Sequence, residues 1–174
     1  MTKIKLVVAV GILCLTTSKI HAAATAPLYN IKLCVISLSK VIDNPLLRLF
    51  ADRLHHVYLT ATGEEGLNFG PETRKHFMCD HARIGIRNYE EASCHSIYET
   101  SDHLDFYGRW QAIHDEYHRL ARSHNYRIAE MNCHNATEMV IDKLGYTVPV
   151  ELHHKLGWQS KWQEKLKKLN SCTP

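Results

Sequence analysis

The stretch that decides the fold is His55–Gly70, which reads HHVYLTATGEEGLNFG. Two runs with strand composition, His55–Thr60 and Gly66–Gly70, flank the polar segment Thr62–Glu65, which contains a glycine. Short apolar and β-branched runs joined by a glycine-containing turn are typical of a β-hairpin. We therefore expect a hairpin at this point of the chain.

Further strands are expected on both sides of the hairpin. Ile31–Leu38 is an apolar run of strand length, and it ends before the breaker Asp43–Pro45. Ala82–Arg87 and Cys94–Glu99 form another candidate pair of strands. The middle of the chain is thus predicted to be mostly sheet.

From Ser101 onward the hydrophobic period changes from that of strands to that of helices. Apolar residues at spacings of three and four predict an amphipathic helix over 102–123: Phe106, Trp110, Ile113, Tyr117 and Leu120. A second helix is expected to begin near Asn132 and to stop at Gly145, and a third to cover Lys161–Leu169. Strands followed by segregated helices predict an α+β fold, with a small antiparallel sheet and helices packed on one side.

The first 24 residues have the organisation of a signal peptide. Met1–Lys5 is short and basic, Leu6–Leu15 is apolar, and Ala22–Ala24 offers a small-residue cleavage site. An apolar run of about ten residues is too short for a permanent membrane span. We expect a signal peptide at 1–24, a single catalytic-type domain at 25–174 and a secreted or periplasmic product.

Export also changes the charge of the protein. The formal net charge of +3 includes Lys3, Lys5 and Lys19, the only charged residues of the removed piece, so the remaining chain is neutral. Proteins that bind nucleic acid normally carry a clear positive excess. The composition therefore argues against a nucleic-acid partner.

Five cysteines remain after export, an odd number for an oxidising compartment. If Cys133 is the unpaired one, three pairings are open to Cys34, Cys79, Cys94 and Cys172. The sequence cannot choose among these pairings, although the short loop between Cys79 and Cys94 favours their pairing.

The unpaired cysteine lies at the start of the second expected helix, in Glu130–Glu138 with the sequence EMNCHNATE. Either Asn132 or Asn135 can serve as the N-cap, and both choices place Cys133 in the first turn or just before it. Free backbone N–H groups and the positive end of the helix dipole favour a thiolate at that place and can also hold an oxyanion. Cys133 is the candidate nucleophile.

A nucleophilic cysteine needs a base, and the hairpin offers one. His55 and His56 point to opposite faces of their strand, so only one can point at the helix, and we favour His56. Asn68, on the partner strand, is the candidate that orients the ring. His95 and His76 compete for these roles.

The order of these parts resembles the papain-like cysteine hydrolases of the NlpC type, in their circularly permuted, lecithin retinol acyltransferase-like branch. The resemblance covers about residues 50–146 and is carried by His56–Leu59, Gly66–Gly70, Trp110, Tyr126 and Asn132–His134. It implies acyl transfer from an amide or ester through a thioester on Cys133, with His56 as the base and Asn68 as the third member. The chain lacks the transmembrane tail of the acyltransferases and carries extra cysteines.

Export and neutrality suggest a peptidoglycan amide as the first substrate, and a lipid ester or another protein's amide as the second. We expect no cofactor and no metal ligand among the site residues.

Two other functions compete with this hypothesis. His114 and His118 lie one helical turn apart, a spacing that zinc sites use, but Asp115 stands where the metalloprotease pattern has Glu. A small exported protein with disulfides can instead be a binding or inhibitor module without catalysis. In that case Cys133 would be buried or bridged.

Overall fold

The structure of the protein is a computed structural model that describes residues 27–41, 54–72, 79–128 and 130–152. The described residues form one mixed fold of strands and helices: β1 (Tyr29–Ser37), the 3-10 helix η1 (Leu38–Lys40), β2 (His55–Ala61), β3 (Leu67–Pro71), β4 (Cys79–Ile86), β5 (Ser93–Thr100), α2 (His103–Ser123), β6 (Asn125–Arg127) and α3 (Cys133–Leu144). The expected signal peptide at 1–24, the breaker at 43–45 and the expected helix at 161–169 lie outside the described residues.

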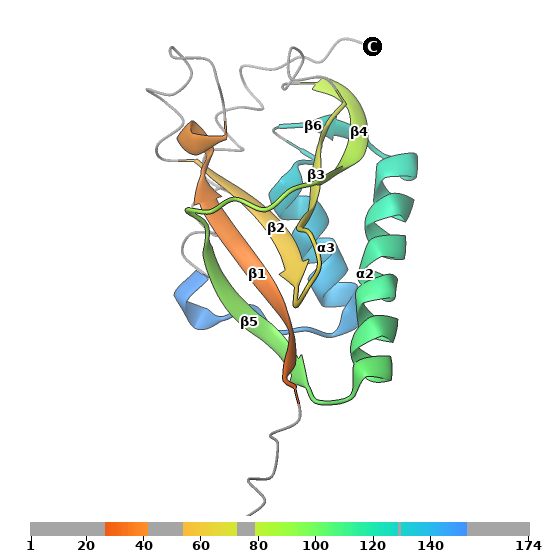
Figure 1. The fold of residues 1–174 in the computed structure, drawn as a ribbon. Coiled ribbons are helices and arrows are strands. Elements are labelled where there is room, and N and C mark those ends of the chain that lie inside the picture. The colour runs from red at the N-terminus through yellow and green to blue at the C-terminus, as the bar shows by residue number, and fades with distance from the viewer. Residues whose placement is uncertain (1–26, 42–53, 73–78, 129, 153–174) are drawn as a thin grey trace, which may run out of the picture.

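The strands form one antiparallel sheet in the order β5-β1-β2-β3-β4-β6, and α2 and α3 pack on it (Figure 1). This confirms the predicted α+β class. The hairpin of β2 and β3 is confirmed too, with Leu59 opposite Leu67. The pairing expected between Ala82–Arg87 and Cys94–Glu99 is wrong, because β4 pairs with β3 and β6 while β5 returns to pair with β1.

Both helices begin and end where local chemistry sets their limits. The carboxylate of Asp102 caps α2 by accepting from the N–H groups of Leu104 and Asp105. Asn132 caps α3 in a capping box: its side-chain oxygen accepts from the backbone N–H of Asn135, and the side-chain oxygen of Asn135 accepts from the backbone N–H of Asn132. Gly145 ends α3 with φ 73°, a left-handed conformation that glycine adopts without strain. The predicted helix limits are therefore correct to within a residue or two.

Alternate residues of the central strands divide into two faces. We call the first the core face: its side chains share one core with α2 and α3, and include Leu33, Val35, Val57, Leu59, Leu67 and Phe69. We call the second the opposite face; by strand alternation and cross-strand register it carries Cys34, Ile36, His56, Tyr58 and Asn68. The two faces separate the apolar core from a cluster of buried polar groups.

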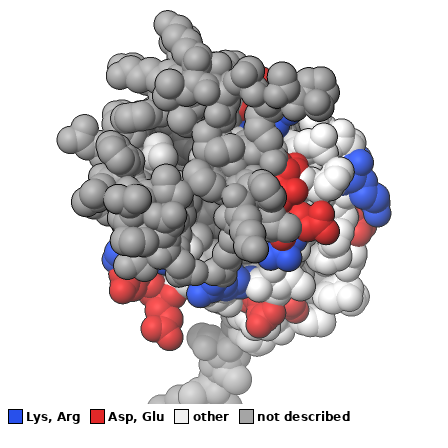
Figure 2. All heavy atoms as spheres, turned by 90° about the horizontal axis from the view of Figure 1, so that it is seen from above, with Lys and Arg blue, Asp and Glu red and all other residues white. Residues whose placement is uncertain are grey.

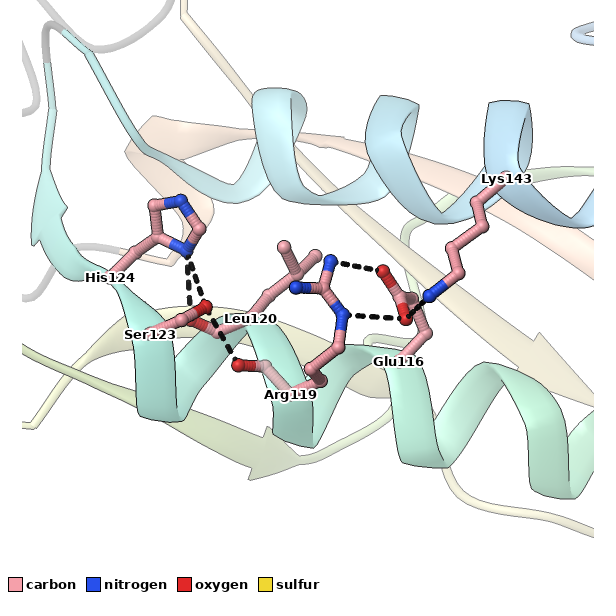
Figure 3. Close-up of polar contacts among 6 residues, drawn as sticks. All are labelled: Glu116, Arg119, Leu120, Ser123, His124 and Lys143. Atoms are coloured by element: carbon pink, nitrogen blue, oxygen red, sulfur yellow. Dashed lines mark hydrogen bonds and ion pairs between the residues drawn. The ribbon is translucent and has the colours of Figure 1, made fainter.

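The two helices are joined by buried polar bonds as well as by apolar packing. Glu116 of α2 is 5% exposed and accepts from Arg119 at 2.5 Å and from Lys143 of α3 at 2.5 Å (Figure 3). Tyr117 and Thr137 share a buried hydroxyl hydrogen bond of 2.7 Å. We call this region the helix junction: it comprises three contacts, Glu116 with Arg119, Glu116 with Lys143 and Tyr117 with Thr137, and the apolar packing around them.

The one disulfide among the described residues joins Cys34 to Cys94. The favoured pairing of Cys79 with Cys94 is therefore wrong. Cys34 and Cys94 are direct cross-strand partners in β1 and β5, a neighbour relation that depends on the sheet order and not on distance along the chain. The side chain of Cys79 and residue Cys172 lie outside what the structure describes.

Acidic and basic side chains lie beside one another on the described surface seen from above (Figure 2). Among the described helices, none is both long and apolar enough to cross a membrane.

Candidate active site

The candidate site lies where β2 and β3 separate, next to the first turn of α3. In an antiparallel strand the N–H and C=O of one residue point to the same side, and successive residues alternate between the two neighbours. The ladder between β2 and β3 pairs Leu59 with Leu67, so the groups of His55 and Val57 on that side are left for other partners. Residues at the start of α3 bind to these backbone groups.

Two consecutive residues of α3 meet this strand edge. His134 donates its Nε2–H to the carbonyl oxygen of His55 over 3.0 Å. The backbone N–H of Val57 interacts with the sulfur of Cys133, as do the N–H groups of His134 and of Cys133 itself. The Cys133 sulfur is therefore surrounded by backbone N–H donors, as expected for a cysteine at a helix start.

Burial affects the pKa of the Cys133 thiol more strongly than those N–H donors do. Cys133 is 4% exposed, and this desolvation raises the pKa of its thiol to about 11, while the three N–H groups act in the opposite direction. Cys133 is thus a neutral thiol at neutral pH. Burial therefore acts against the expected resting thiolate, and the three N–H groups offset this effect only in part.

His56 and Asn68 lie together on the opposite face, as expected from the hairpin. The amide nitrogen of Asn68 donates to the carbonyl of Gly85 at 3.1 Å, and its side chain also forms a hydrogen bond with the His56 ring. Gly85 makes room for this amide, because a Cβ there would lie 3.0 Å from its oxygen. Asn68 is therefore held in place beside the His56 ring.

The ring of His56 is buried and neutral. Desolvation lowers its pKa to about 4, although the Asn68 bond raises it. Its Nε2 has no hydrogen-bond partner among the described residues, so the bond to Asn68 uses Nδ1, and the lone pair of the neutral ring lies on Nε2. A buried lone pair of this kind is able to accept a proton.

The expectation that His56 points at the helix is wrong. His56 lies on the opposite face, and alternation places His55 on the core face that the helices cover. The ring of His56 still interacts electrostatically with His134, because α3 begins at the edge of the strand and not under its centre. The sequence could not reveal this placement, since alternation gives a side chain's face but not where a helix meets the strand.

His134 is the site residue that the sequence analysis missed. It is 2% exposed, burial lowers its pKa to about 3, and its Nδ1 has no hydrogen-bond partner in the described segments. The sequence signal was its position directly after the candidate nucleophile, in the first turn of a helix.

The competing residues lie elsewhere. His95 is on β5, where its Nε2 lies 3.3 Å from the hydroxyl of Ser93, and His76 lies outside the described residues. His114 and His118 stack with ring centroids 4.3 Å apart, but the described residues hold no group of three His, Cys, Asp or Glu side chains that could bind a metal.

A cavity of about 290 Å³ lies at the other end of α3 from Cys133, and its lining includes Asp105, Arg109, Leu144 and Tyr146. It contains none of the candidate catalytic residues. Comparisons with protein-family models, with curated proteins and with solved structures find no match for this chain.

Proposed function

We propose that the protein is an exported cysteine hydrolase or acyltransferase, with Cys133 as the nucleophile, His56 as the base and Asn68 as the residue that orients His56. The observation that carries the proposal is the combination of a cysteine in the first turn of α3, bounded by backbone N–H groups, with a buried His56–Asn68 pair near the same strand edge. The order of these parts resembles that of the permuted papain-like fold. This order supports a permuted papain-like arrangement as the finer description of the architecture.

The chemistry follows from the protonation states. Burial keeps both the Cys133 thiol and the His56 imidazole neutral at rest, so the proton moves to the imidazole only as the sulfur attacks. The sulfur forms a bond to the carbonyl carbon of an amide or ester, and the imidazolium gives its proton to the departing amine or alcohol. Water, activated by the same imidazole, then hydrolyses the thioester and regenerates the thiol.

A peptidoglycan amide is the first substrate we propose, and a lipid ester or another protein's amide the second. The disulfide Cys34–Cys94 supports export, because such bonds persist in oxidising compartments. Without residues 1–24 the chain has a formal net charge of zero, which argues against a nucleic-acid partner.

A non-catalytic binding or inhibitor module is the second candidate. It is favoured by one specific observation, the burial of Cys133, since a buried free cysteine often serves only as a small apolar side chain.

Intact mass spectrometry separates the two candidates. The full exported chain is incubated with p-nitrophenyl acetate and, separately, with peptidoglycan fragments and a short-chain phospholipid, alongside Cys133→Ala. We expect an acetyl adduct on Cys133 and product release with one natural substrate, both absent from the variant. Wild type and Cys133→Ala with the same slow background would exclude the hydrolase and leave the binding module.

A further inference from the structure

His134 connects the start of α3 to the edge of β2. A carbonyl oxygen can only accept, so the Nε2 of His134 must carry the hydrogen in its 3.0 Å bond to His55. That bond fixes the ring in one tautomer and holds the first turn of α3 against the strand.

The same strand edge contacts the nucleophile one residue earlier. Val57, two residues after His55, interacts through its backbone N–H with the sulfur of Cys133. His55 and Val57 point to the same side of β2, so the two contacts lie next to each other along one edge. A change in the His134 bond therefore alters the position of the sulfur relative to Val57.

The cap residue of α3 fixes the same turn to a different part of the chain. Asn132 caps the helix through the N–H groups of His134 and Asn135, and its own amide nitrogen donates to Ile128 at 2.8 Å, so it fixes the helix start to the preceding turn. His134, in contrast, bonds the first turn of α3 directly to β2.

We propose that His134 is a positioning residue for Cys133: by donating Nε2–H to the carbonyl of His55, it holds the Cys133 sulfur against the N–H of Val57. The role of this positioning in turnover rests on the proposed hydrolase function, whereas its effect on the thiol does not. Titratable groups that face the site are His55 and His56 from β2, Tyr117 from α2 and Tyr126 from β6.

The test compares His134→Gln with His134→Leu in the full exported chain. The amide nitrogen of glutamine can take the place of Nε2 and donate to His55, whereas leucine fills similar space without a donor. The readouts are the rate of Cys133 alkylation by iodoacetamide from pH 7 to 11, kcat and KM for the acyl substrate, and the thermal midpoint. A merely structural residue would change the thermal midpoint without changing the pH profile of the thiol.

We expect His134→Leu to shift the alkylation profile to higher pH, because the thiolate loses the Val57 donor, and to lower kcat about 100-fold with little change in KM. His134→Gln should restore both values to near those of the wild type. Equal profiles for wild type and His134→Leu, or no rescue by glutamine, would overturn the proposal. If His134→Leu does not fold, His134→Asn replaces it, since its shorter amide cannot reach the carbonyl of His55.

The experiments can disprove the hydrolase function and the positioning role of His134 independently of each other. If no acyl adduct forms on the wild type but the alkylation profile still shifts and is rescued, the hydrolase is wrong and the positioning stands. If the adduct forms and the profile does not shift, only the positioning is wrong.

Discussion

The helix junction and the start of α3 are both buried and polar, but their hydrogen bonding differs. At the junction, Glu116 has two charged partners and the Tyr117 hydroxyl is bonded to Thr137. Around the start of α3, His56 of β2 and His134 of α3 each keep a ring nitrogen without a partner in the described part of the chain. Fully bonded polar groups stabilise a fold, whereas an unpartnered buried nitrogen reduces stability and needs an explanation. The unpartnered nitrogens therefore single out the surroundings of the α3 start as the place where the proposed chemistry can be tested.

The largest effect is expected from His56→Gln. It removes the proposed base but keeps an amide that can contact Asn68, so turnover of the acyl substrate should fall about 10²–10⁴-fold with a smaller change in stability. The matched control is His81→Gln, an exposed histidine on β4, which should leave turnover unchanged. Kinetics of both variants beside the wild type give the answer, and equal rates for all three would remove His56 from the mechanism.

The next effect is expected from Glu116→Gln at the helix junction. Losing the buried carboxylate weakens its bonds to Arg119 and Lys143, and because both partners are about half exposed and can return to water, we expect a loss of about 2 kcal/mol in the free energy of unfolding. Turnover per folded molecule should stay unchanged. Glu130→Gln, which breaks the exposed pair with Arg127, is the control, with a smaller loss. Urea unfolding measures both; equal losses would show that the junction is no stronger than a surface pair.

The helix junction and the start of α3 are expected to lose stability over different ranges of acidic pH. Burial lowers the pKa of His56 to about 4 and that of His134 to about 3, so below pH 6.5 the unfolded chain binds more protons than the folded chain. The stability that the two neutral rings contribute is complete above pH 6.5 and is lost as the pH falls from 6.5 toward these two values. Hydrogen bonds from Arg119 lower the pKa of Glu116 to about 2, so its contribution is full above pH 4.5 and is lost as the pH falls toward 2.

We therefore expect the urea midpoint of the wild type to fall already between pH 6 and pH 4, and His56→Gln to fall less steeply over this range. Glu116→Gln should match the slope of the wild type above pH 4.5 and differ from it below that value. Identical slopes for wild type and His56→Gln between pH 6 and pH 4 would contradict the burial of a neutral His56.

The smallest effect is expected from metal removal. His114 and His118 on α2 have no third ligand among the described residues, so a chelator should leave turnover unchanged, and His118→Gln should behave like the wild type. A stoichiometric metal in the purified protein, or loss of activity that zinc restores, would revive the metal-dependent alternative.

Local patterns predicted most of the elements. The hairpin of β2 and β3, the strand β1 and both helices with their caps follow from periodicity, turn residues and capping residues that act over a few positions. The three-residue strand β6 was missed, because Asn125–Arg127 is too short to show a period. The pairing of β4 with β5 was wrong, because the partner of a strand depends on the whole sheet.

At the candidate site, the sequence by itself determined the chemical parts: a cysteine in a helix start that Asn132 caps, and a hairpin that brings His56 and Asn68 together. Only the tertiary structure decided their states and neighbours. Burial raised the pKa of Cys133 and lowered that of His56, the sheet order joined Cys34 to Cys94, and the separation of β2 from β3 let His134 bond to His55. The reason is that capping and turn formation depend on residues close in sequence, whereas desolvation and strand-edge contacts depend on groups that only the folded chain brings together.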